Sequence, residues 1–310
     1  MRWLPDCPNF LRRNEPLNTH TSIGIGGPAD YFAEPNSVDE LLRLLTWAKL
    51  RDIPLVFFGS GTNLLVSDRG FRGCVVRLSR TPFTRLHIAA QDASETVTVT
   101  CGAGVSTQQL VRAALRHGFG PVHALSGLPG SIGGAVAMNA QNIGALIDRV
   151  TVITDDIEVV QRSKAQCEFG YRSADLGGGL VIQATMTFQR LTDDGDKLGV
   201  QRVLAHRRTT QELQLPSAGC AFKNPSTEQS AGRLIDLSGL KGSRVGDACV
   251  SSRHANFVVN AGCSRSVDVL LLMERVQQRV WRDHGLWLEP EVRIIGERWE
   301  QPPSTRGAAT

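Results

Sequence analysis

Residues 54–63 have the sequence Pro-Leu-Val-Phe-Phe-Gly-Ser-Gly-Thr-Asn, a short apolar run that ends in a loop with two glycines. The length and bulk of the apolar run predict a buried strand. Ahead of it, Ser37 precedes two acidic residues and a leucine-rich face, which predicts an N-capped amphipathic helix to about Leu50. A helix, a strand and a glycine loop in this order are typical of an α/β nucleotide-binding unit.

The glycine loop has an ordinary explanation as well. Backbone N–H groups around glycines can bind a pyrophosphate at the end of a strand, but glycine turns after strands are also common without a ligand. The loop has neither the G-x-G-x-x-G pattern of dinucleotide-binding folds nor the Gly-Lys-Ser/Thr of a P-loop. Taken alone, it leaves both a phosphate-binding loop and a structural turn open.

Strand and helix patterns alternate along the rest of the chain. Strands are expected within 85–105, over most of 150–188, and at 256–259 and 288–295. Helices are expected from a Ser106 or Thr107 cap to Gly118, at 200–208 and 231–237, and at 267–284 with Ser266 as cap and Gly285 as stop. Between them, 126–144 is a long glycine-rich segment and 191–197 is expected to form a surface turn.

The composition is that of an ordinary globular protein of two or three domains. Of 310 residues, 41% are hydrophobic and 21% are charged, and the net charge of +4 comes without a dense run of Lys or Arg. No stretch approaches 18 consecutive apolar residues, and residues 1–15 lack the apolar core of a secretion signal. We therefore expect no nucleic-acid partner, no membrane partner and a loose N-terminal tail.

The seven cysteines are odd in number and scattered, and no C-x-x-C pair occurs. This pattern argues against a metal knuckle and a thioredoxin-type motif. Thiols that stay reduced are typical of the cytoplasm. We therefore expect no metal site and a cytoplasmic protein.

One cysteine lies in a distinctive setting. Residues 216–225, Pro-Ser-Ala-Gly-Cys-Ala-Phe-Lys-Asn-Pro, place Cys220 among small residues and just ahead of Lys223 and Asn224. Small residues let a substrate approach the backbone, and a thiol can hold a proton at neutral pH and still release it. A tight loop around a buried cysteine explains the stretch equally well, because cysteine is among the most buried residue types.

Three further stretches can carry chemistry, and each has a plain alternative. Small residues crowd 129–140, which leaves room for a large flat ligand or packs a tight turn. Arg172 follows an aromatic pair and can hold a carboxylate through two parallel hydrogen bonds, or it forms a surface ion pair. Glu289, Glu291 and Arg293 would share one face of the expected 288–295 strand, toward solvent or toward a site.

Taken in order, these segments resemble the UDP-N-acetylenolpyruvoylglucosamine reductases (MurB) from about Leu17 to Gly296. The resemblance rests on residues 18–27, 59–66, 129–139, 169–172, 216–225, 251–257 and 289–296. Several motifs in one order over nearly the whole chain make this resemblance specific. The short span between Arg172 and Pro216 resembles the compact subtype of the family.

The resemblance implies an α+β fold, with a two-part FAD-binding module (PCMH-type, MurB-like) followed by a C-terminal α/β substrate domain. On this basis we expect a tail at 1–16, FAD-binding subdomains at 17–83 and 84–208, a substrate domain at 209–298 and a tail at 299–310. It also implies a monomeric enzyme of peptidoglycan precursor synthesis with FAD as cofactor, NADPH as co-substrate and UDP-N-acetylglucosamine enolpyruvate as substrate. Hydride would pass from NADPH through FAD to the terminal alkene carbon, and a protein acid would protonate the adjacent carbon to give UDP-N-acetylmuramate.

The family motifs also imply roles for individual residues. Cys220 would donate the proton, Arg172 would bind the substrate carboxylate on which charge develops, and Glu291 would stabilise the same intermediate while protonated. Asn224 and Lys223 would contact the substrate. The implied cofactor contacts are Gly59, Ser60, Gly61, Thr62, Asn63, Pro129, Gly130, Ser131, Gly133, Gly134 and Asn139.

The chain departs from the family pattern at several positions. Many members have serine where Cys220 stands, and a thiol, being more acidic, remains a capable proton donor. Thr62 keeps the hydroxyl of the usual serine. Gln141-Asn142-Ile143 replaces a stretch that is often Gly-Ala-Tyr, so a tyrosine contact from that loop is in doubt, and Glu212 replaces a frequent proline. None of these changes removes a charged catalytic group, so we expect an active enzyme.

Two other functions remain as alternatives. One is another flavin oxidoreductase on the same scaffold, which the combination of Arg172, Cys220 and Glu291 disfavours. The other is a nucleotide-sugar binding or regulatory module without turnover, which only the changed loop at Gln141 favours. Protein that is not yellow would favour the module, whereas yellow protein that oxidises NADPH only with the enolpyruvyl sugar present would favour the reductase.

Overall fold

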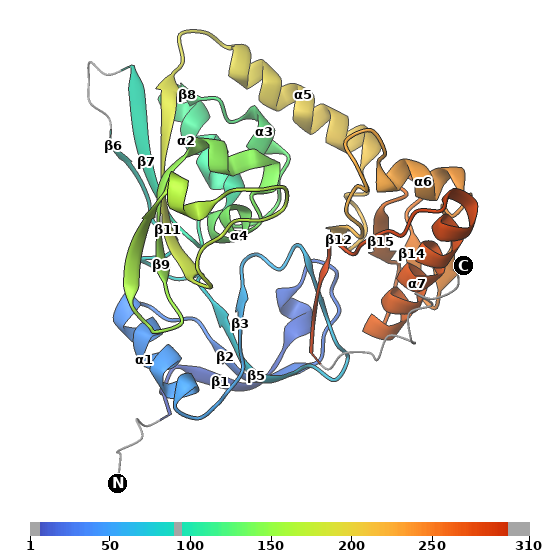
Figure 1. The fold of residues 1–310 in the computed structure, drawn as a ribbon, viewed down its shortest axis with the longest axis horizontal. Coiled ribbons are helices and arrows are strands. Elements are labelled where there is room, and N and C mark those ends of the chain that lie inside the picture. The colour runs from blue at the N-terminus through green and yellow to red at the C-terminus, as the bar shows by residue number, and fades with distance from the viewer. Residues whose placement is uncertain (1–6, 90–94, 297–310) are drawn as a thin grey trace, which may run out of the picture. The chain divides into compact units, whose positions relative to one another are not determined.

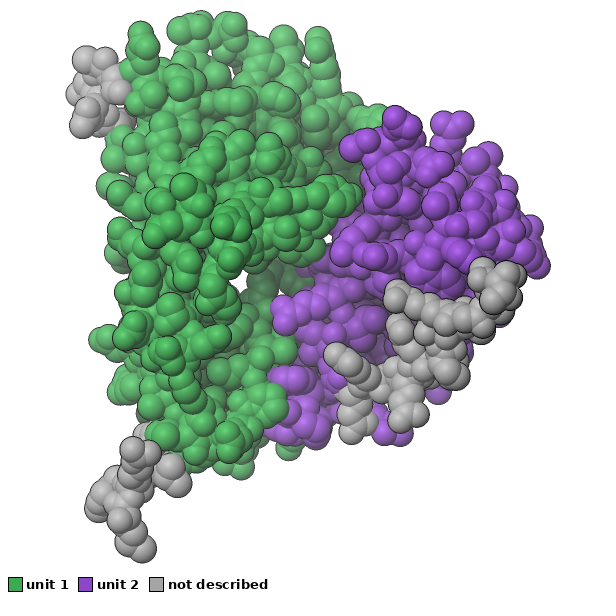
Figure 2. Space-filling model, in the orientation of Figure 1, with its two compact units in different colours: residues 1–14, 31–61, 73–211 green, residues 15–30, 62–72, 212–310 purple. Residues whose placement is uncertain are grey.

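The structure is a computed structural model that describes residues 7–89 and 95–296. The chain divides into two compact units, coloured separately in Figure 2. Unit 1 is formed by the described parts of 1–14, 31–61 and 73–211, and unit 2 by 15–30, 62–72 and the described part of 212–310. Helices and sheets occur in both units, which confirms the expected α+β class (Figure 1).

A four-stranded sheet has the order β1-β2-β5-β3. Its strands are β1 (Leu11–Pro16), β2 (Pro28–Ala33), β3 (Leu55–Phe58) and β5 (Phe71–Arg77), and β3 runs parallel to β5. Helix α1 (Val38–Lys49) begins after Ser37, whose hydroxyl accepts a hydrogen bond from Glu40 N at 3.1 Å. The predicted helix, its cap and the predicted strand at 54–58 are therefore confirmed.

The expectation of a loose tail over 1–16 is wrong for its last six residues. Residues 11–16 form strand β1, at the edge of the four-stranded sheet. The sequence Leu-Arg-Arg-Asn-Glu-Pro has no alternation of apolar and polar residues. Charged residues are typical of edge strands, and they hide such strands from pattern analysis. Residues 1–6, and the expected tail at 299–310, lie outside the described residues.

The larger sheet of unit 1 is antiparallel, in the order β10-β9-β11-β7-β6. Its strands are β6 (Leu86–Ala89), β7 (Thr96–Gly102), β9 (Ile147–Ile153), β10 (Val159–Ser163) and β11 (Leu180–Arg190), with β8 (Phe119–Gly120) paired to β11. Figure 1 shows α2 (Thr107–His117), α3 (His123–Ser126) and α4 (Ile132–Ala137) together on one face of this sheet. Ser106 caps α2 and Gly118 ends it, as predicted.

Two expectations for unit 1 need correction. The glycine-rich segment 126–144, for which no element was predicted, contains α4 and most of the 3-10 helix η2 (Ala140–Leu146). Residues 164–179 interrupt the expected β region with a 3-10 helix, η3 (Lys164–Cys167), and a loop. Helix α5 (Gly195–Thr210) begins five residues before the predicted helix, inside the expected surface turn.

Unit 2 combines a sheet of order β12-β15-β14-β13 with a parallel pair, β4 and β16. These strands are β4 (Leu64–Val66), β12 (Ser217–Cys220), β13 (Arg244–Val245), β14 (Ala248–Val250), β15 (Phe257–Asn260) and β16 (Arg293–Ile295). Helices η1 (Leu17–His20), α6 (Ala231–Leu237) and α7 (Ser266–His284) complete it. The apolar stripe of α7, from Val269 through Met273 to Val280, packs into one core with Ile23 and Leu65.

The predicted strand at 288–295 is largely wrong. Only Arg293–Ile295 forms a strand, and Pro290 makes an isolated bridge with Phe222. Proline lacks the N–H that a continuous ladder needs. Burial does not alternate either, since Val292 is buried while both Arg293 and Ile294 are exposed. The charged residues therefore do not line one regular strand face.

Helix α7 begins differently from the prediction. Ser266 is its first residue rather than its cap. The Ser266 hydroxyl donates to Asp68 Oδ2 at 2.8 Å, and Ser266 N donates to Asp68 Oδ1 at 2.8 Å. A carboxylate from a distant loop thus binds the donors at the start of the helix.

Replacing Asp68 with alanine is expected to destabilise unit 2 by about 1–2 kcal/mol, as loss of a helix cap does. Thermal unfolding of the purified protein measures this change. Asp156→Ala is the control. Its carboxylate is 88% exposed and forms a loose ion pair with Lys49 Nζ at 3.5 Å, and exposed pairs of this kind add little stability. Equal melting temperatures for Asp68→Ala and the parent would contradict the assignment.

No helix in the part of the chain that the structure describes has both the length and the apolar character that a membrane crossing needs.

Candidate functional site

Cys220 is placed by a bulge in strand β12. Ser217 pairs with Val259 and Cys220 with Phe257, so three steps along β12 match two along β15. Gly219 supplies the extra residue at φ +77°, a conformation that glycine adopts without strain. The bulge turns Cys220 to a partly exposed position at the end of the strand. The alternative of a buried cysteine is wrong, because Cys220 is partly exposed, and its role in the chemistry stays a prediction.

The segment after Cys220 pairs with the one that contains Glu291. Glu291 N donates to Ala221 O at 2.8 Å, and Lys223 N donates to Glu289 O at 2.9 Å. Cys220 and Glu291 therefore lie on adjacent backbone segments of unit 2, although they are far apart in the sequence. Main-chain hydrogen bonds hold the two segments together.

Asn256 forms hydrogen bonds with the segment that follows Cys220. It is buried, and its Nδ2 donates to Phe222 O at 2.8 Å while its Oδ1 accepts from Phe222 N at 3.0 Å. Its own carbonyl accepts from Ala221 N at 2.8 Å. Sequence analysis gave Asn256 no role. Asn256 lies in the 251–257 segment on which the resemblance rests, but its contact with the 216–225 stretch depends on the pairing of β12 with β15, which no local sequence pattern shows.

The end of the 59–63 loop belongs to the same part of unit 2. Asn63 Nδ2 donates to Glu291 O at 3.2 Å, and Asn63 O accepts from Arg293 N at 3.0 Å. A Cβ on Gly219 would lie 3.8 Å from Thr62 O. Thr62 and Asn63, expected as cofactor contacts, thus adjoin the backbone that carries Cys220 and Glu291.

In unit 1, the start of the same loop meets the small-residue segment. A Cβ on Gly59 would come 2.5 Å from Ser131 Oγ, so a larger residue there would displace the Ser131 hydroxyl. Ser131 is buried and bridges to Ser106, and Ile132 N donates to Val105 O at 2.8 Å. The expected cofactor residues on 59–61 and 129–134 are therefore brought together, with Gly59, Pro129 and Gly134 exposed.

Arg172 lies on a loop that Asn139 holds. Asn139 Nδ2 donates to Gly170 O at 2.8 Å, and Asn139 Oδ1 accepts from Gly144 N at 2.9 Å. The buried Asn139 side chain, expected as a cofactor contact, thus serves the loop itself. Arg172 has φ +55°, and its guanidinium lies 6.0 Å from the ring centre of the exposed Tyr171.

Of the three residues at 141–143, one lies in the interior and two lie on the surface. Ile143 is fully buried in the core of unit 1, while Gln141 and Asn142 are exposed with φ of +52° and +57°. Positive φ is unusual for residues other than glycine and asparagine. The loop thus keeps a conformation that suits the glycine often found there, but it presents two carboxamides instead.

The two residues expected to contact the substrate, Asn224 and Lys223, each have a partner within unit 2. Asn224 Oδ1 accepts from Ala231 N at 3.1 Å, at the start of α6. Lys223 Nζ lies 3.5 Å from Glu289 Oε2, and the two side chains are 41% and 73% exposed. Asn224 is exposed as well, so both residues remain accessible to a ligand.

The cysteines differ sharply in accessibility. Burial raises the pKa of the Cys74 and Cys101 thiols to about 12. Cys167 and Cys249 are also buried, whereas Cys7 and Cys263 are exposed and Cys220 is partly exposed. None of the seven forms a disulfide. Within residues 7–89 and 95–296, no three His, Cys, Asp or Glu side chains gather as metal ligands would.

Alkylation of the native protein with iodoacetamide at pH 8 is expected to label Cys7, Cys220 and Cys263 only. A thiol with a pKa near 12 is deprotonated in about one molecule in 10⁴ at this pH, and burial excludes the reagent as well. Peptide mass spectrometry after timed quenching measures each site. Labelling of Cys74 or Cys101 as fast as Cys220 would contradict the structure, and labelling of all seven in denaturant is the control.

Two family models match successive parts of the chain. Residues 29–161 match a model described as an FAD binding domain. Residues 211–295 match one described as the C-terminal domain of UDP-N-acetylenolpyruvoylglucosamine reductase. The second match spans the segments that carry Cys220, Asn256 and Glu291.

Whole-length relatives have the same name. The UDP-N-acetylenolpyruvoylglucosamine reductase 2 of Symbiobacterium thermophilum is 43% identical over 302 residues, which cover 96% of each chain. The reductase of Pelobacter propionicus is 39% identical and covers 93% of this chain and 96% of its own. The crystal structure of the MurB reductase from Thermus caldophilus matches with a TM-score of 0.76 and 34% identity, over 92% of this chain and 98% of that one. The resemblance seen in the motifs is confirmed, and the chain belongs to the UDP-N-acetylenolpyruvoylglucosamine reductase family.

Proposed function

We propose that this protein is an FAD-dependent reductase that uses NADPH to convert UDP-N-acetylglucosamine enolpyruvate to UDP-N-acetylmuramate in peptidoglycan precursor synthesis. One observation carries this proposal beyond family membership. Main-chain hydrogen bonds hold the Cys220 and Glu291 segments side by side in unit 2. A proton donor and a second acidic group are the side chains that protonation of a reduced enolpyruvyl ether requires.

The residues of unit 1 fit FAD. Gly59 on the loop and Gly134 on the neighbouring segment are both exposed, and neither carries a side chain that would cover its backbone. Exposed backbone N–H groups at a strand end and a helix start suit a pyrophosphate. We infer that residues 59–63 and 129–134 hold the cofactor. When bound, FAD supplies the hydride transfer from NADPH to the terminal alkene carbon.

The chain's own residues then stabilise the developing negative charge and supply the proton. Arg172 binds the substrate carboxylate, on which negative charge develops as hydride is added. Cys220 Sγ donates its proton to the carbon adjacent to that carboxylate. Glu291, while protonated, donates a hydrogen bond to the same developing charge. Lys223 and Asn224 bind the phosphate or sugar part of the substrate.

The wider assignments follow the same proposal. We assign cofactor binding to 17–83 and 84–208 and substrate binding to 209–298. A cytoplasmic location is supported by seven cysteines without a disulfide. We further propose that the enzyme acts as a monomer, which sedimentation of the purified protein tests.

The function is tested by following flavin colour without oxygen. The purified protein, reconstituted with FAD if necessary, is expected to lose its yellow absorbance on addition of NADPH and to regain it on addition of the enolpyruvyl sugar. Protein that binds no FAD would overturn the proposal in favour of a binding module. Protein that NADPH bleaches but the enolpyruvyl sugar does not reoxidise would point to a different oxidoreductase.

A further inference from the structure

The pairing of β12 with β15 ends at Cys220 and Phe257, and the side chain of Asn256 continues it. Asn256 Nδ2 donates to Phe222 O at 2.8 Å, and Asn256 Oδ1 accepts from Phe222 N at 3.0 Å. Two directly opposed residues of antiparallel strands exchange the same pair of hydrogen bonds through their main chains. The carboxamide of Asn256 thus takes the place of a strand residue where the ladder stops.

The backbone that follows Cys220 is bound from two directions. Ala221 N donates to Asn256 O at 2.8 Å, while Ala221 O accepts from Glu291 N at 2.8 Å. Phe222 is only 1% exposed and forms an isolated bridge with Pro290. Residues 221 and 222 therefore connect Asn256 with the segment that carries Glu291, and Asn256 makes three hydrogen bonds to them.

Asn256 is itself held in place. It is 3% exposed, and its N–H donates to His254 Nδ1 at 3.3 Å. The centre of the His254 ring lies 4.7 Å from the centre of the Phe257 ring. Burial lowers the pKa of His254, which keeps Nδ1 unprotonated and able to accept this hydrogen bond. The carboxamide therefore extends from a backbone that is fixed by its own neighbours.

Few other side chains can replace Asn256 in this contact. A carboxamide donates and accepts at the same time, whereas an ionised carboxylate of the same size only accepts. Aspartate at 256 would thus leave the buried Phe222 carbonyl without its donor and place a negative charge beside it.

We propose that Asn256 is a positioning residue for the reductase reaction, and that it sets the place of Cys220 Sγ by fixing the backbone of residues 221 and 222. This inference rests on the proposed function, because it needs Cys220 as the proton donor. A displacement of about 1 Å at a reacting group can slow a reaction about 10²-fold. Loss of the carboxamide should therefore slow proton delivery while FAD is still reduced by NADPH at the parent rate.

The test variant is Asn256→Asp in the FAD-loaded full-length protein. Anaerobic stopped-flow absorbance is expected to show that reoxidation by the enolpyruvyl sugar slows about 10–100-fold, with KM for the sugar within about threefold of the parent. Bleaching of the flavin by NADPH should keep the parent rate. Reoxidation of a folded Asn256→Asp variant at the parent rate would overturn the proposal.

Asn260→Ala is the matched control, since Asn260 is a second buried asparagine at the other end of β15. Its Nδ2 donates to Ile23 O at 3.1 Å, and its Oδ1 accepts from Gly262 N and Ser264 N, each at 3.1 Å. Removing these bonds should lower the melting temperature, as loss of buried hydrogen bonds does, but keep reoxidation within about threefold of the parent. A loss of reoxidation rate equal to that of Asn256→Asp would mean that general loss of stability is the cause, and would overturn the proposal.

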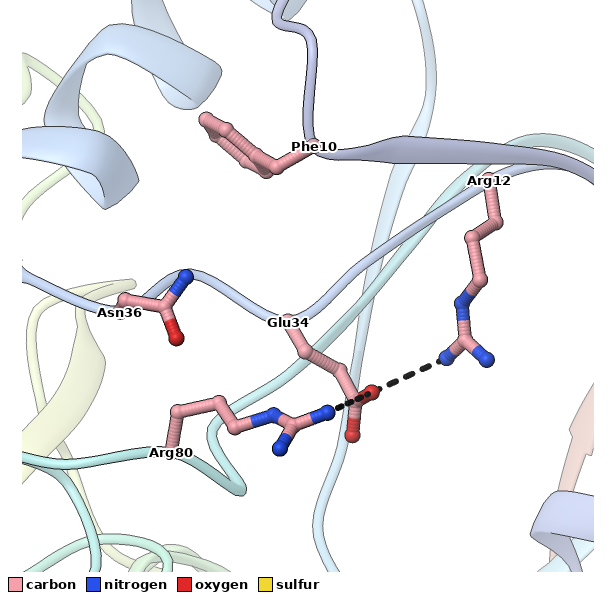
Figure 3. A pocket seen from close by; sticks show the side chains of 5 residues that line it. All are labelled: Phe10, Arg12, Glu34, Asn36 and Arg80. Carbon is pink, nitrogen blue, oxygen red and sulfur yellow. Dashed lines mark hydrogen bonds and ion pairs between the residues drawn. The ribbon is translucent and has the colours of Figure 1, made fainter.

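An exposed asparagine of unit 1 supplies a second control. Asn36 lines a pocket of about 270 Å³ in which the Arg12 and Arg80 side chains approach Glu34 from opposite directions (Figure 3). Asn36→Ala removes a carboxamide that has no part in the proposed chemistry. Its melting temperature and both half-reactions should match those of the parent.

A double-mutant cycle with Cys220→Ala separates positioning from general support of the fold. If Asn256 acts through Cys220, Asn256→Asp should slow reoxidation by less than about twofold once residue 220 is alanine. A further loss as large as that in the parent background would overturn the proposal. If the aspartate variant fails to fold, Asn256→Ser is measured in the same cycle, with the same expectations and the same contrary results.

The positioning role and the proposed function can be told apart when they fail. A parent protein that NADPH bleaches but the enolpyruvyl sugar does not reoxidise would overturn the proposed function, and the positioning role with it. A parent that is reoxidised, and that Cys220→Ala slows but Asn256→Asp does not, would overturn the positioning role alone.

Discussion

Replacing Cys220 with alanine is expected to lower kcat for the enolpyruvyl sugar by about 10²–10⁴-fold, the usual contribution of a positioned general acid. Reduction of bound FAD by NADPH should proceed at the parent rate, since Cys220 has no part in that half of the reaction. The lost step is proton delivery to the carbon beside the substrate carboxylate. Turnover would then stall with reduced cofactor and bound substrate.

Anaerobic stopped-flow absorbance separates the two halves. The first mixing step, with NADPH, should give the same bleaching rate in Cys220→Ala and in the parent. The second, with the enolpyruvyl sugar, should give a reoxidation rate that falls by the predicted factor only in the variant. Full turnover by Cys220→Ala would remove Cys220 from the mechanism.

Cys220→Ser is the matched control, because a serine hydroxyl also carries a proton that it can donate. It should keep kcat within about tenfold of the parent while losing sensitivity to alkylation. The fold should tolerate both changes. The bulge that positions residue 220 is made by Gly219, and the neighbouring hydrogen bonds use main-chain atoms of Ala221 and Phe222 together with Asn256.

Local chemistry accounts for the parts of the fold that the sequence predicted well. Ser37, Ser106, Gly118 and Gly285 each determine a helix end through contacts within a few residues, and all four act as expected. The β-branched run at 96–100 is likewise a strand in its own right. Such elements can be predicted because the residues that determine them lie within a few positions of one another in the sequence.

The mispredicted elements depend on residues far away in the chain. Strand β1 is polar because it lies at a sheet edge, and α7 begins at Ser266 because Asp68, 198 positions earlier, binds its first N–H. The supposed strand at 288–295 follows an apolar pattern, but Pro290 and its pairing partner Phe222 limit it. No local pattern contains these partners.

Some features of the candidate site could likewise be predicted from local sequence, and others depend on distant residues. The residue types at 220 and 291 were recognisable as chemistry, and the resemblance supplied their roles. The other features depend on segments that are distant in the sequence. They are the bulge at Gly219, the hydrogen bonds from Asn256 to Phe222, and the hydrogen bond from Asn63 Nδ2 to Glu291 O, which spans 228 positions. The Asn139 side chain holds the Arg172 loop, and its expected contact with the cofactor stays a prediction.

Glu291→Gln is expected to lower kcat by about 10²–10³-fold with little change in KM for the substrate, as loss of a contact made only in the transition state does. Glutamine keeps the size of the side chain but has no carboxyl proton to donate and cannot titrate. The fold should be unaffected. The hydrogen bonds of residue 291 to Ala221 O and from Asn63 Nδ2 use its main-chain N–H and C=O, which the substitution leaves in place.

Steady-state kinetics and thermal unfolding of Glu291→Gln test this directly, and Glu289→Gln is the control on the same segment. The Glu289 side chain is 73% exposed and pairs only loosely, at 3.5 Å, with Lys223. Its kcat should therefore stay within about twofold of the parent, since exposed ion pairs contribute little. If Glu289→Gln lost as much kcat as Glu291→Gln, the effect would belong to the charge of the whole segment, and the specific role of Glu291 would be wrong. A melting temperature that falls in Glu291→Gln but not in Glu289→Gln would mean that the side chain supports the fold, and the kinetic loss would then say nothing about the reaction.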